Sequence, residues 1–162
     1  MSTQSVRPLR ADDLSAVKAV IDSTGLFPSE LMDGMTAAFL SRASDELWFV
    51  AEAGGAKVDG DVCAVAYAAP ERMTDGAWNL LLIAVRKDRQ GRGLGAALTR
   101  TVEAVLAGRG ARILLVETSG LPAFERTRAV YQRLGYVREA TVRGFYAEGE
   151  DKVIFWKSLT GL

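Results

Sequence analysis

The sequence predicts a mixed α/β (α+β) domain built around one sheet, and three observations lead to this fold class. The chain has 162 residues, 49% of them hydrophobic and 25% charged, which suits a single globular domain over residues 1–162 with a substantial core. Apolar residues recur at helical spacing in some segments and form short strand-like runs in others. The order is strand, two helices, a run of strands, helix, strand, helix and a closing hairpin.

The first quarter of the chain predicts a strand followed by two helices. We expect the strand over 5–10 and a helix that begins at Asp12-Asp13, since carboxylates favour a helix start. Gly25 ends this helix, and a second helix opens at Phe27-Pro28-Ser29 and continues to Leu40. The apolar face of the first helix comprises Leu14, Val17, Val20 and Ile21.

The middle of the chain predicts strands, and the last part alternates helices with strands. Runs 47–53 and 61–69 flank a glycine-rich connection over 54–60, which is typical of a hairpin. The fourth run, 78–85, is nearly all apolar, so we expect it to be buried on both faces. A third helix ends near Gly108–Gly110. A fifth strand over 112–118, a helix with Pro122 in its first turn and Gly135 at its stop, and a hairpin of 137–146 and 152–159 turning through 148–151 follow in that order.

A basic, glycine-rich loop leads into the third helix and is the most informative segment of the sequence. It reads Val85-Arg-Lys-Asp-Arg-Gln-Gly-Arg-Gly-Leu-Gly-Ala96. A helix N-terminus presents unpaired N–H donors and a positive dipole end, which together make an anion site. Cations near a helix start are disfavoured by ~0.3–1 kcal/mol each. We therefore expect a bound anion whose charge is offset by the four cations of the loop, Arg86, Lys87, Arg89 and Arg92.

Two general phosphate-binding patterns fit this loop poorly. The pattern G-x-x-x-x-G-K-[ST] fails because Ala96 and Ala97 follow Gly95. The dinucleotide fingerprint G-x-G-x-x-G/A is met formally by Gly91, Gly93 and Ala96, but five polar residues separate it from the preceding strand. Too little chain follows Glu117 to complete a dinucleotide-binding sheet.

A third pattern fits best. Gln90-Gly-Arg-Gly-Leu-Gly95 reads as Q-x-x-G-x-G and, with Leu82–Val85 before it, resembles the acetyl-coenzyme A motif of the GCN5-related N-acetyltransferase (GNAT) superfamily. Downstream, Ala129-Val-Tyr131-Gln-Arg-Leu-Gly135-Tyr136 resembles the late helix of that family. The resemblance extends from about Trp78 to Val137, and element order alone carries it before that.

The resemblance implies a central, mostly antiparallel sheet that is splayed between its fourth and fifth strands and flanked by about four helices. It implies acetyl-coenzyme A (acetyl-CoA) as cosubstrate and no metal. The pantothenate arm would pair with backbone groups of Ile83 and Val85, and Arg128 would take the place of a coenzyme contact that relatives make with an Asn at the position of Phe124. The pyrophosphate would be bound by the loop residues Gln90, Gly91, Arg92, Gly93, Leu94, Gly95 and Ala96.

The resemblance also implies two catalytic roles. Tyr131 would donate a proton to the leaving thiolate, because a phenol with a pKa of about 10 stays protonated at neutral pH. By helical periodicity alone, Tyr131 would be a packing residue. Many relatives carry a basic Glu on the fourth strand, but Asn79 occupies that place here. Glu117, at the end of the fifth strand, is the substitute we predict, and a rim carboxylate paired with an Arg is the open alternative.

The acceptor is predicted from weaker signals. Phe27, Phe145 and Tyr146 would line its pocket, and a primary amine of a small or amino-acid-like molecule suits aromatic side chains with a few carboxylates. The alternatives are acetylation of a protein N-terminus or lysine, which a long open groove would favour, and a non-catalytic acyl-CoA-binding sensor. The sequence does not decide between a monomer and a homodimer.

Composition excludes several other classes of function. Lys plus Arg equals Asp plus Glu, at 20 each, so no overall field favours nucleic acid or an anionic membrane. The chain has one cysteine and no histidine, which excludes a disulfide framework, common zinc sites and Ser-His or Cys-His catalysis. Cys63 lies in an apolar run and is predicted to be core. Because the sequence shows neither a signal stretch nor an apolar run of membrane-spanning length, we expect a cytoplasmic protein.

Overall fold

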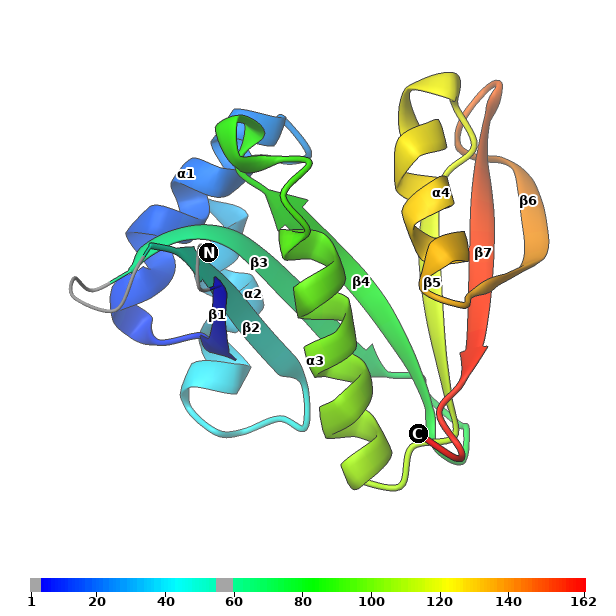
Figure 1. Ribbon diagram of the computed structural model, residues 1–162, viewed down its shortest axis with the longest axis horizontal. Coiled ribbons are helices and arrows are strands. Elements are labelled where there is room, and N and C mark those ends of the chain that lie inside the picture. Colours follow the sequence, from blue (N-terminus) through cyan, green and yellow to red (C-terminus); the bar gives the residue numbers. More distant parts are fainter. Residues whose placement is uncertain (1–3, 55–59) are drawn as a thin grey trace. The chain divides into compact units, whose positions relative to one another are not determined.

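A computed structural model describes residues 4–54 and 60–162 and shows the predicted mixed α/β fold (Figure 1). The seven strands form one sheet in the order β1-β2-β3-β4-β5-β7-β6. β4 and β5 pair in parallel, whereas β1–β2, β2–β3, β5–β7 and β6–β7 are antiparallel. The strands are β1 (Gln4–Pro8), β2 (Leu47–Ala53), β3 (Asp61–Pro70), β4 (Ala77–Val85), β5 (Ile113–Ser119), β6 (Val137–Ala147) and β7 (Glu150–Ser158). The helices are α1 (Leu14–Thr24), α2 (Leu31–Leu40), α3 (Leu94–Gly108) and α4 (Glu125–Arg133).

Two compact units make up the chain, and each combines segments that are distant in sequence. Unit 1 contains Met1–Ala69 and Leu82–Val102, and unit 2 contains Pro70–Leu81 and Glu103–Leu162. β4 and α3 each contribute their two halves to different units. Of the predicted connection over 54–60, residues 55–59 lie outside the described part of the chain.

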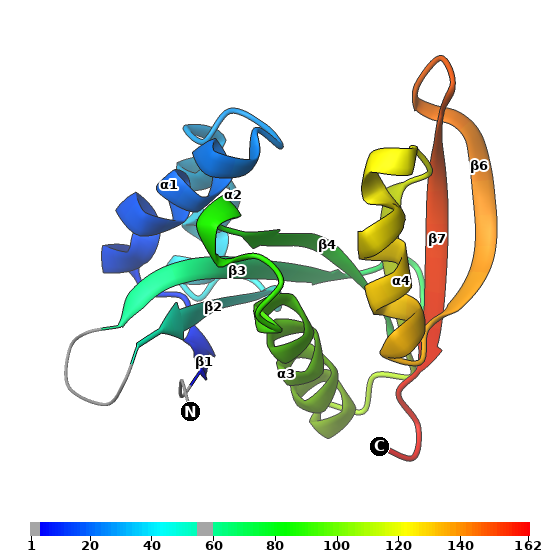
Figure 2. The same ribbon diagram turned by 45° about the horizontal axis from the view of Figure 1, so that its top comes forward.

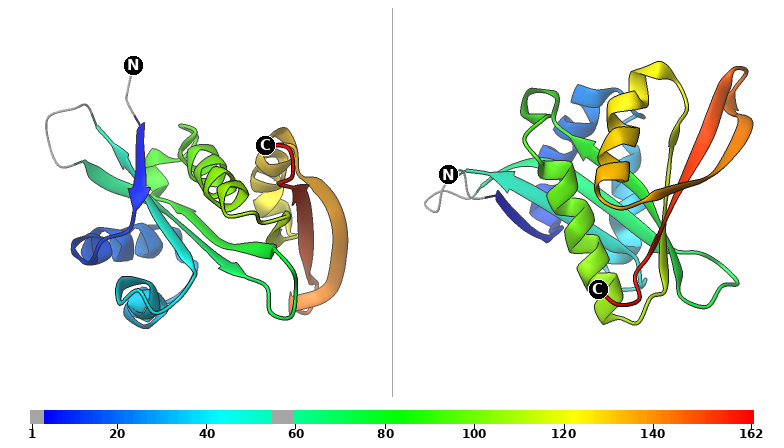
Figure 3. Two further views of the ribbon diagram at one scale, coloured as in Figure 1. Left: turned by 90° about the horizontal axis from the view of Figure 1, so that it is seen from below. Right: turned by 45° about the vertical axis from the view of Figure 1, so that its right-hand side comes forward.

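In unit 1, α1 and α2 cover one face of β2 and β3, and the first turns of α3 lie on the other face (Figure 3). The apolar stripe predicted for α1 is buried, with Val17, Val20 and Ile21 fully inaccessible. α1 stops at Gly25 because this residue adopts φ 64°, a left-handed conformation that ends a helix. The core of the unit also includes Met32, Trp48, Val50, Val65 and Leu82.

In unit 2, β5 pairs with the first half of β4 on one side and with β7 on the other. The parallel ladder joins Ala77–Leu80 to Ile113–Val116. α4 runs beside β5 and β7, and β6 follows β7 on its far side (Figures 1 and 2). Buried residues alternate along β5 and β7, so that Leu114, Val116, Val153 and Phe155 share one face. Every residue of β6 is exposed.

Some predicted boundaries differ from the structure, and local hydrogen bonds explain the differences. α2 begins at Leu31 rather than at Phe27–Ser29, because the N–H groups of Leu31 and Met32 first close a turn onto the carbonyls of Pro28 and Ser29. Pro122 opens a 3₁₀ turn that precedes α4 rather than α4 itself. The final strand starts two residues earlier than predicted, at Glu150.

Candidate active site

The glycine-rich loop of unit 1 ends in a helix start with free backbone donors. α3 begins at Leu94, within the predicted loop, because the N–H of Ala97 donates to the carbonyl of Gly93 at 3.0 Å. The N–H groups of Leu94, Gly95 and Ala96 precede this first intrahelical bond, so the helix supplies no acceptor for them. Gly93 adopts φ 80° and Gly91 φ 74°, a region that side chains disfavour by about 1–2 kcal/mol.

Gly95 lies at the junction between the first turn of α3 and the end of β4. It is helical, and a methyl group built on it would lie 3.6 Å from Ile83 Cγ2 and 3.9 Å from Val85 Cγ2. The end of β4 therefore packs directly against the first turn of α3. Gln90 fixes the loop through its side chain, whose Nε2 donates to the carbonyl of Val85 at 3.1 Å. Ile83 and Val85 are both half-buried at this junction.

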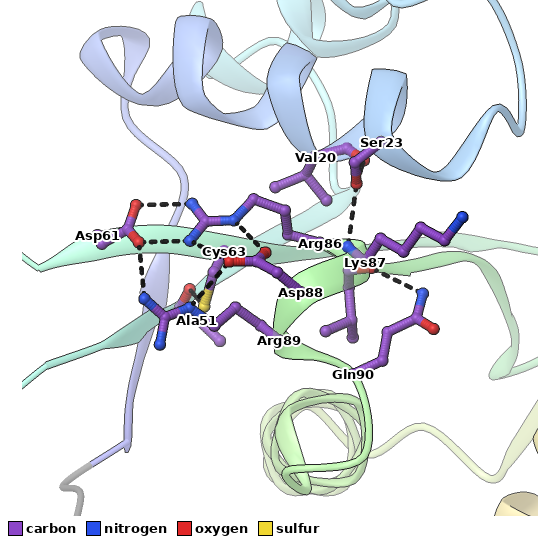
Figure 4. Close-up of polar contacts among 11 residues, drawn as sticks. Val20, Ser23, Ala51, Asp61, Cys63, Arg86, Lys87, Asp88, Arg89 and Gln90 are labelled. Carbon is purple, nitrogen blue, oxygen red and sulfur yellow. Dashed lines mark hydrogen bonds and ion pairs between the residues drawn. The ribbon is translucent and has the colours of Figure 1, made fainter.

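Two of the four loop cations have their charges offset by aspartates of the protein itself (Figure 4). Arg86 donates from both Nη atoms to Asp61, at 2.8 and 2.6 Å, and from Nε to Asp88 at 2.7 Å. Arg89 pairs with the same two aspartates at 3.6 and 3.5 Å. The Arg86 guanidinium holds the pKa of both Asp61 and Asp88 below their usual range.

Arg86 and Arg89 therefore need no bound anion to offset their charges, and the offsetting of phosphate charge by the loop cations stays a prediction. Sequence spacing did not reveal Asp61 as a partner, because Asp61 begins β3 and reaches the loop only in the fold. Lys87 and Arg92 are exposed, and within residues 4–54 and 60–162 neither side chain has an acidic partner. The loop backbone is held by the Arg86 N–H on the Cys63 carbonyl at 2.8 Å and by the Lys87 N–H on Ser23 Oγ at 3.1 Å.

Tyr131 lies on α4 in unit 2, in an aromatic environment. Its ring centroid is 5.7 Å from that of Phe155 and 5.7 Å from that of Tyr136. The side chain is 6% exposed, and burial raises the pKa of its hydroxyl. Gly135, at φ 89°, ends the helix as predicted, and the N–H of Tyr136 donates back to the carbonyl of Tyr131. Tyr131 thus remains protonated at neutral pH.

A buried polar network lies beside Tyr131 and was not predicted. Tyr136 Oη donates to Glu103 Oε1 at 2.8 Å, and Lys157 Nζ donates to Glu103 Oε2 at 2.9 Å and to the Leu134 carbonyl at 2.8 Å. Burial, with Glu103 as the second cause, raises the pKa of Tyr136. The network joins the second half of α3, the end of α4 and β7.

Glu117 belongs to a second polar cluster of unit 2. Asn79 Nδ2 donates to Glu117 Oε1 at 3.1 Å and to Glu71 Oε1 at 2.9 Å. Lys152 Nζ donates to Glu117 Oε2 at 3.1 Å and lies 3.6 Å from the ring centroid of Phe145. Glu117 is therefore an ion-paired carboxylate, as in the predicted alternative, but its cationic partner is Lys152 rather than an Arg.

The sequence of residues 44–138 matches the family model described as an acetyltransferase (GNAT) domain. The chain belongs to the GNAT acetyltransferase family. A GNAT-family protein from Desulfovibrio desulfuricans is 30% identical, with 99% of this chain and 100% of that chain covered and a TM-score of 0.81. The ribosomal-protein-S18-alanine N-acetyltransferase of Escherichia coli is 23% identical, with coverages of 99% and 96% and a TM-score of 0.75. A protein of Salmonella typhimurium, solved with its cofactor acetyl-CoA, has a TM-score of 0.79 at 15% identity, with coverages of 99% and 96%.

The family assignment confirms the predicted fold and the predicted class of enzyme, an acetyltransferase. Within this GNAT chain, Tyr131 and Glu117 are placed in the same unit but on opposite faces of the β5–β7 ladder. Tyr131 packs on Phe155, whose cross-strand partner is Val116, whereas Glu117 shares the other face with Ile154. The structure therefore does not bring these two side chains into contact.

The remaining predicted site residues of this GNAT protein have mixed surroundings. Phe27 packs against the core of unit 1. Phe145 and Tyr146 are 53% and 46% exposed and stack edge to face, with centroids 5.1 Å apart. Arg128 donates from Nη1 to the carbonyls of Ser119 and Leu121, at 2.7 and 2.9 Å, and so ties α4 to the end of β5.

Two members of the Glu117 cluster, Glu71 and Lys152, were not predicted from the sequence. The signal that pointed toward such partners was Asn79. Asn79 is a polar residue within the apolar run of β4, and buried polar groups need hydrogen-bond partners. Glu71 lies in the connection before β4, and its N–H donates to the Ala77 carbonyl. Lys152 becomes adjacent to Glu117 only through the β5–β7 register, in which Glu117 pairs with Ile154.

None of the described helices is long and apolar enough to cross a membrane.

Proposed function

We propose that this GNAT protein is an acetyl-CoA-dependent N-acetyltransferase that acetylates a primary amine of a small or amino-acid-like acceptor. The start of α3 carries the proposal, because three N–H groups without a helical acceptor, two left-handed glycines and two cations with no acidic partner among the described residues suit a pyrophosphate. The Salmonella relative was solved with acetyl-CoA, and we extend that cosubstrate to this chain.

The loop would hold the coenzyme by its backbone. The N–H groups of Leu94, Gly95 and Ala96 would donate to pyrophosphate oxygens, and Lys87 and Arg92 would offset the phosphate charge. Backbone groups of Ile83 and Val85 would pair with the pantothenate arm. Acetyl-CoA supplies the activated acyl group, a thioester, and all proton transfers fall to side chains of the protein.

Tyr131 and Glu117 would move the protons. As the amine nitrogen bonds to the thioester carbon and the carbon–sulfur bond breaks, Tyr131 gives its hydroxyl proton to the departing sulfur. Glu117 accepts the proton lost by the amine, directly or through a water molecule. A positioned acid or base contributes ~10²–10⁴-fold to such a step.

An acceptor screen tests the proposal. The protein is incubated with acetyl-CoA and amino acids, polyamines, aminoglycosides or peptides, and free thiol and acetylated amine are measured together. Peptides with an N-terminal alanine belong in the screen because the Escherichia coli relative is named for that acceptor. We expect thiol release matched by acetylation of a small amine. Release with peptides alone would favour a protein acceptor, and calorimetric acetyl-CoA binding without release would indicate a sensor.

A further inference from the structure

One amide nitrogen in unit 2 holds two carboxylates. Asn79 is 3% exposed, and its Nδ2 donates to Glu71 Oε1 and Glu117 Oε1 at 2.9 and 3.1 Å. Carboxylate oxygens only accept hydrogen bonds when ionised, so the nitrogen of the amide, and not its oxygen, must face them. Glu71 and Glu117 thus flank the same nitrogen atom.

The oxygen of the same amide lacks a donor. Asn79 Oδ1 is buried and has no hydrogen-bond partner among the residues that the structure describes. A planar amide has two N–H bonds, one of them on the side of its oxygen. Nδ2 and Oδ1 belong to one small planar amide, so the unpartnered oxygen lies close to the nitrogen that holds both carboxylates. Asn79 Oδ1 and the two carboxylates therefore lie in a common region that contains acceptors and needs donors.

The cluster of Glu71, Asn79, Glu117 and Lys152 carries a net negative charge, which also favours a ligand that donates hydrogen bonds and is positively charged. Lys152 compensates Glu117 through Oε2, and its side chain is only 12% exposed. Glu71 has no cationic partner within residues 4–54 and 60–162, and Asn79 contributes no charge. Glu71 is half-buried, and a carboxylate that is partly removed from water without a counter-ion is destabilised. One additional monovalent cation would balance the cluster.

We propose that Glu71, Asn79 and Glu117 bind the primary ammonium group of the acceptor, a proposal that rests on the proposed function for the identity of that ligand. An ammonium group has three N–H donors, which match Glu71, Asn79 Oδ1 and Glu117. Lys152 shows that the site receives such a group, since its own ammonium contacts both Glu117 and the Phe145 ring. A divalent metal fits less well, because the Asn79 amide nitrogen, a donor, already lies within hydrogen-bond distance of an oxygen of each carboxylate.

Binding of simple ligands tests the site without catalysis. n-Butylammonium chloride and butan-1-ol have the same chain length and differ in charge. Each is titrated into the wild-type protein at neutral pH while the Asn79 side-chain amide is followed by NMR. We expect butylammonium to shift this resonance with saturation and butan-1-ol to leave it unchanged. Equal shifts with both ligands, or displacement of butylammonium by lower concentrations of Mg²⁺ or Ca²⁺, would overturn the proposal.

A variant pair locates the interaction. Glu71→Gln removes one charge but keeps an oxygen that can accept from Asn79, and we expect it to weaken butylammonium binding at least about tenfold. Glu139→Gln removes a charge from an exposed position of β6 and should leave binding unchanged. Equal affinity in wild type and Glu71→Gln would overturn the assignment of Glu71, and the wild-type comparison of the two ligands remains decisive if the variant is unstable.

The two proposals fail differently. Ammonium binding that depends on Glu71, in a protein that releases no thiol with any amine, would support the site and refute the transferase. Thiol release with an amine KM unchanged by Glu71→Gln would support the transferase and refute the site.

Discussion

At the scale of single residues, Tyr131 is the group whose role the structure makes easiest to isolate. Its ring packs on Phe155 and Tyr136, but within residues 4–54 and 60–162 its hydroxyl makes no hydrogen bond. We expect Tyr131→Phe to lower kcat by roughly 10²-fold or more while acetyl-CoA affinity and the melting temperature stay nearly constant. Calorimetry and steady-state kinetics measure these quantities. Parallel losses of stability and coenzyme binding would instead identify Tyr131 as a packing residue.

Glu117 requires a design that separates its titration from that of the acceptor. With an acceptor whose amine is neutral across the tested pH range, a fall in kcat/KM at low pH reports the protonation of a group on the enzyme. We expect this acidic limb of the pH profile to disappear in Glu117→Gln, because a base that cannot be protonated no longer loses activity as pH falls. Lys152→Gln, which keeps the Glu117 carboxylate, is the control and should retain the limb. A wild-type limb that persists in Glu117→Gln would exclude Glu117 as the base.

At the scale of elements, the start of α3 distinguishes conformational from steric requirements for glycine. Gly93→Ala should lower the free energy of unfolding by about 1–2 kcal/mol, because φ 80° is unfavourable for a side chain. Gly95→Ala should keep or raise stability, since its methyl meets only ordinary contacts and Ala favours a helix. Denaturant titration measures the free energy of unfolding of both variants, and calorimetry measures their affinity for acetyl-CoA. Weaker coenzyme binding by a stable Gly95→Ala protein is expected, and unchanged binding would argue against backbone capture at this turn.

The Tyr136 phenol contributes one hydrogen bond to the network that joins α3, α4 and β7. Tyr136→Phe leaves Glu103, which is 5% exposed, with one hydrogen bond fewer. We expect a loss of about 1–3 kcal/mol in the free energy of unfolding, measured in urea. Tyr146→Phe is the matched control, because that hydroxyl has no hydrogen bond within the described chain. Equal losses in both variants would contradict a specific role for the network.

The sequence predicted elements better than it predicted side-chain partners. Periodicity placed α1 and its buried stripe, and the glycines placed the ends of α1 and α4. The start of α2 was missed because a turn at Pro28 and Ser29 precedes the helix. The Asp61–Arg86 and Glu71–Asn79–Glu117 contacts join residues whose proximity depends on strand register, which one sequence does not reveal. Tyr131 was predicted through a family motif, and its aromatic neighbours came only from the fold.

At the scale of the whole molecule, the net charge is zero, so attraction of a phosphate must come from local charges such as those of the loop. Of the four loop cations, Arg86 and Arg89 pair with aspartates, whereas Lys87 and Arg92 have no acidic partner among the described residues. Acetyl-CoA binding should therefore weaken as salt rises, since exposed charges are screened beyond about 8–10 Å at physiological ionic strength. Combined Lys87→Gln and Arg92→Gln should lower the affinity and flatten its salt dependence, whereas Arg126→Gln on α4 should change neither. Calorimetry at several salt concentrations tests this, and salt-independent wild-type binding would refute it.

Because Cys63 is fully buried, the wild-type protein has no reactive thiol that would compete in site-directed labelling. Cys63 is the only cysteine, has no accessible surface and directs Sγ to the Ala51 carbonyl at 3.6 Å. Burial raises the pKa of its thiol and so suppresses the reactive thiolate. A cysteine introduced at exposed Tyr146 would be the only side chain to accept a fluorophore or spin label. Any ligand-induced motion of the β6–β7 hairpin could then be measured without first removing a native cysteine.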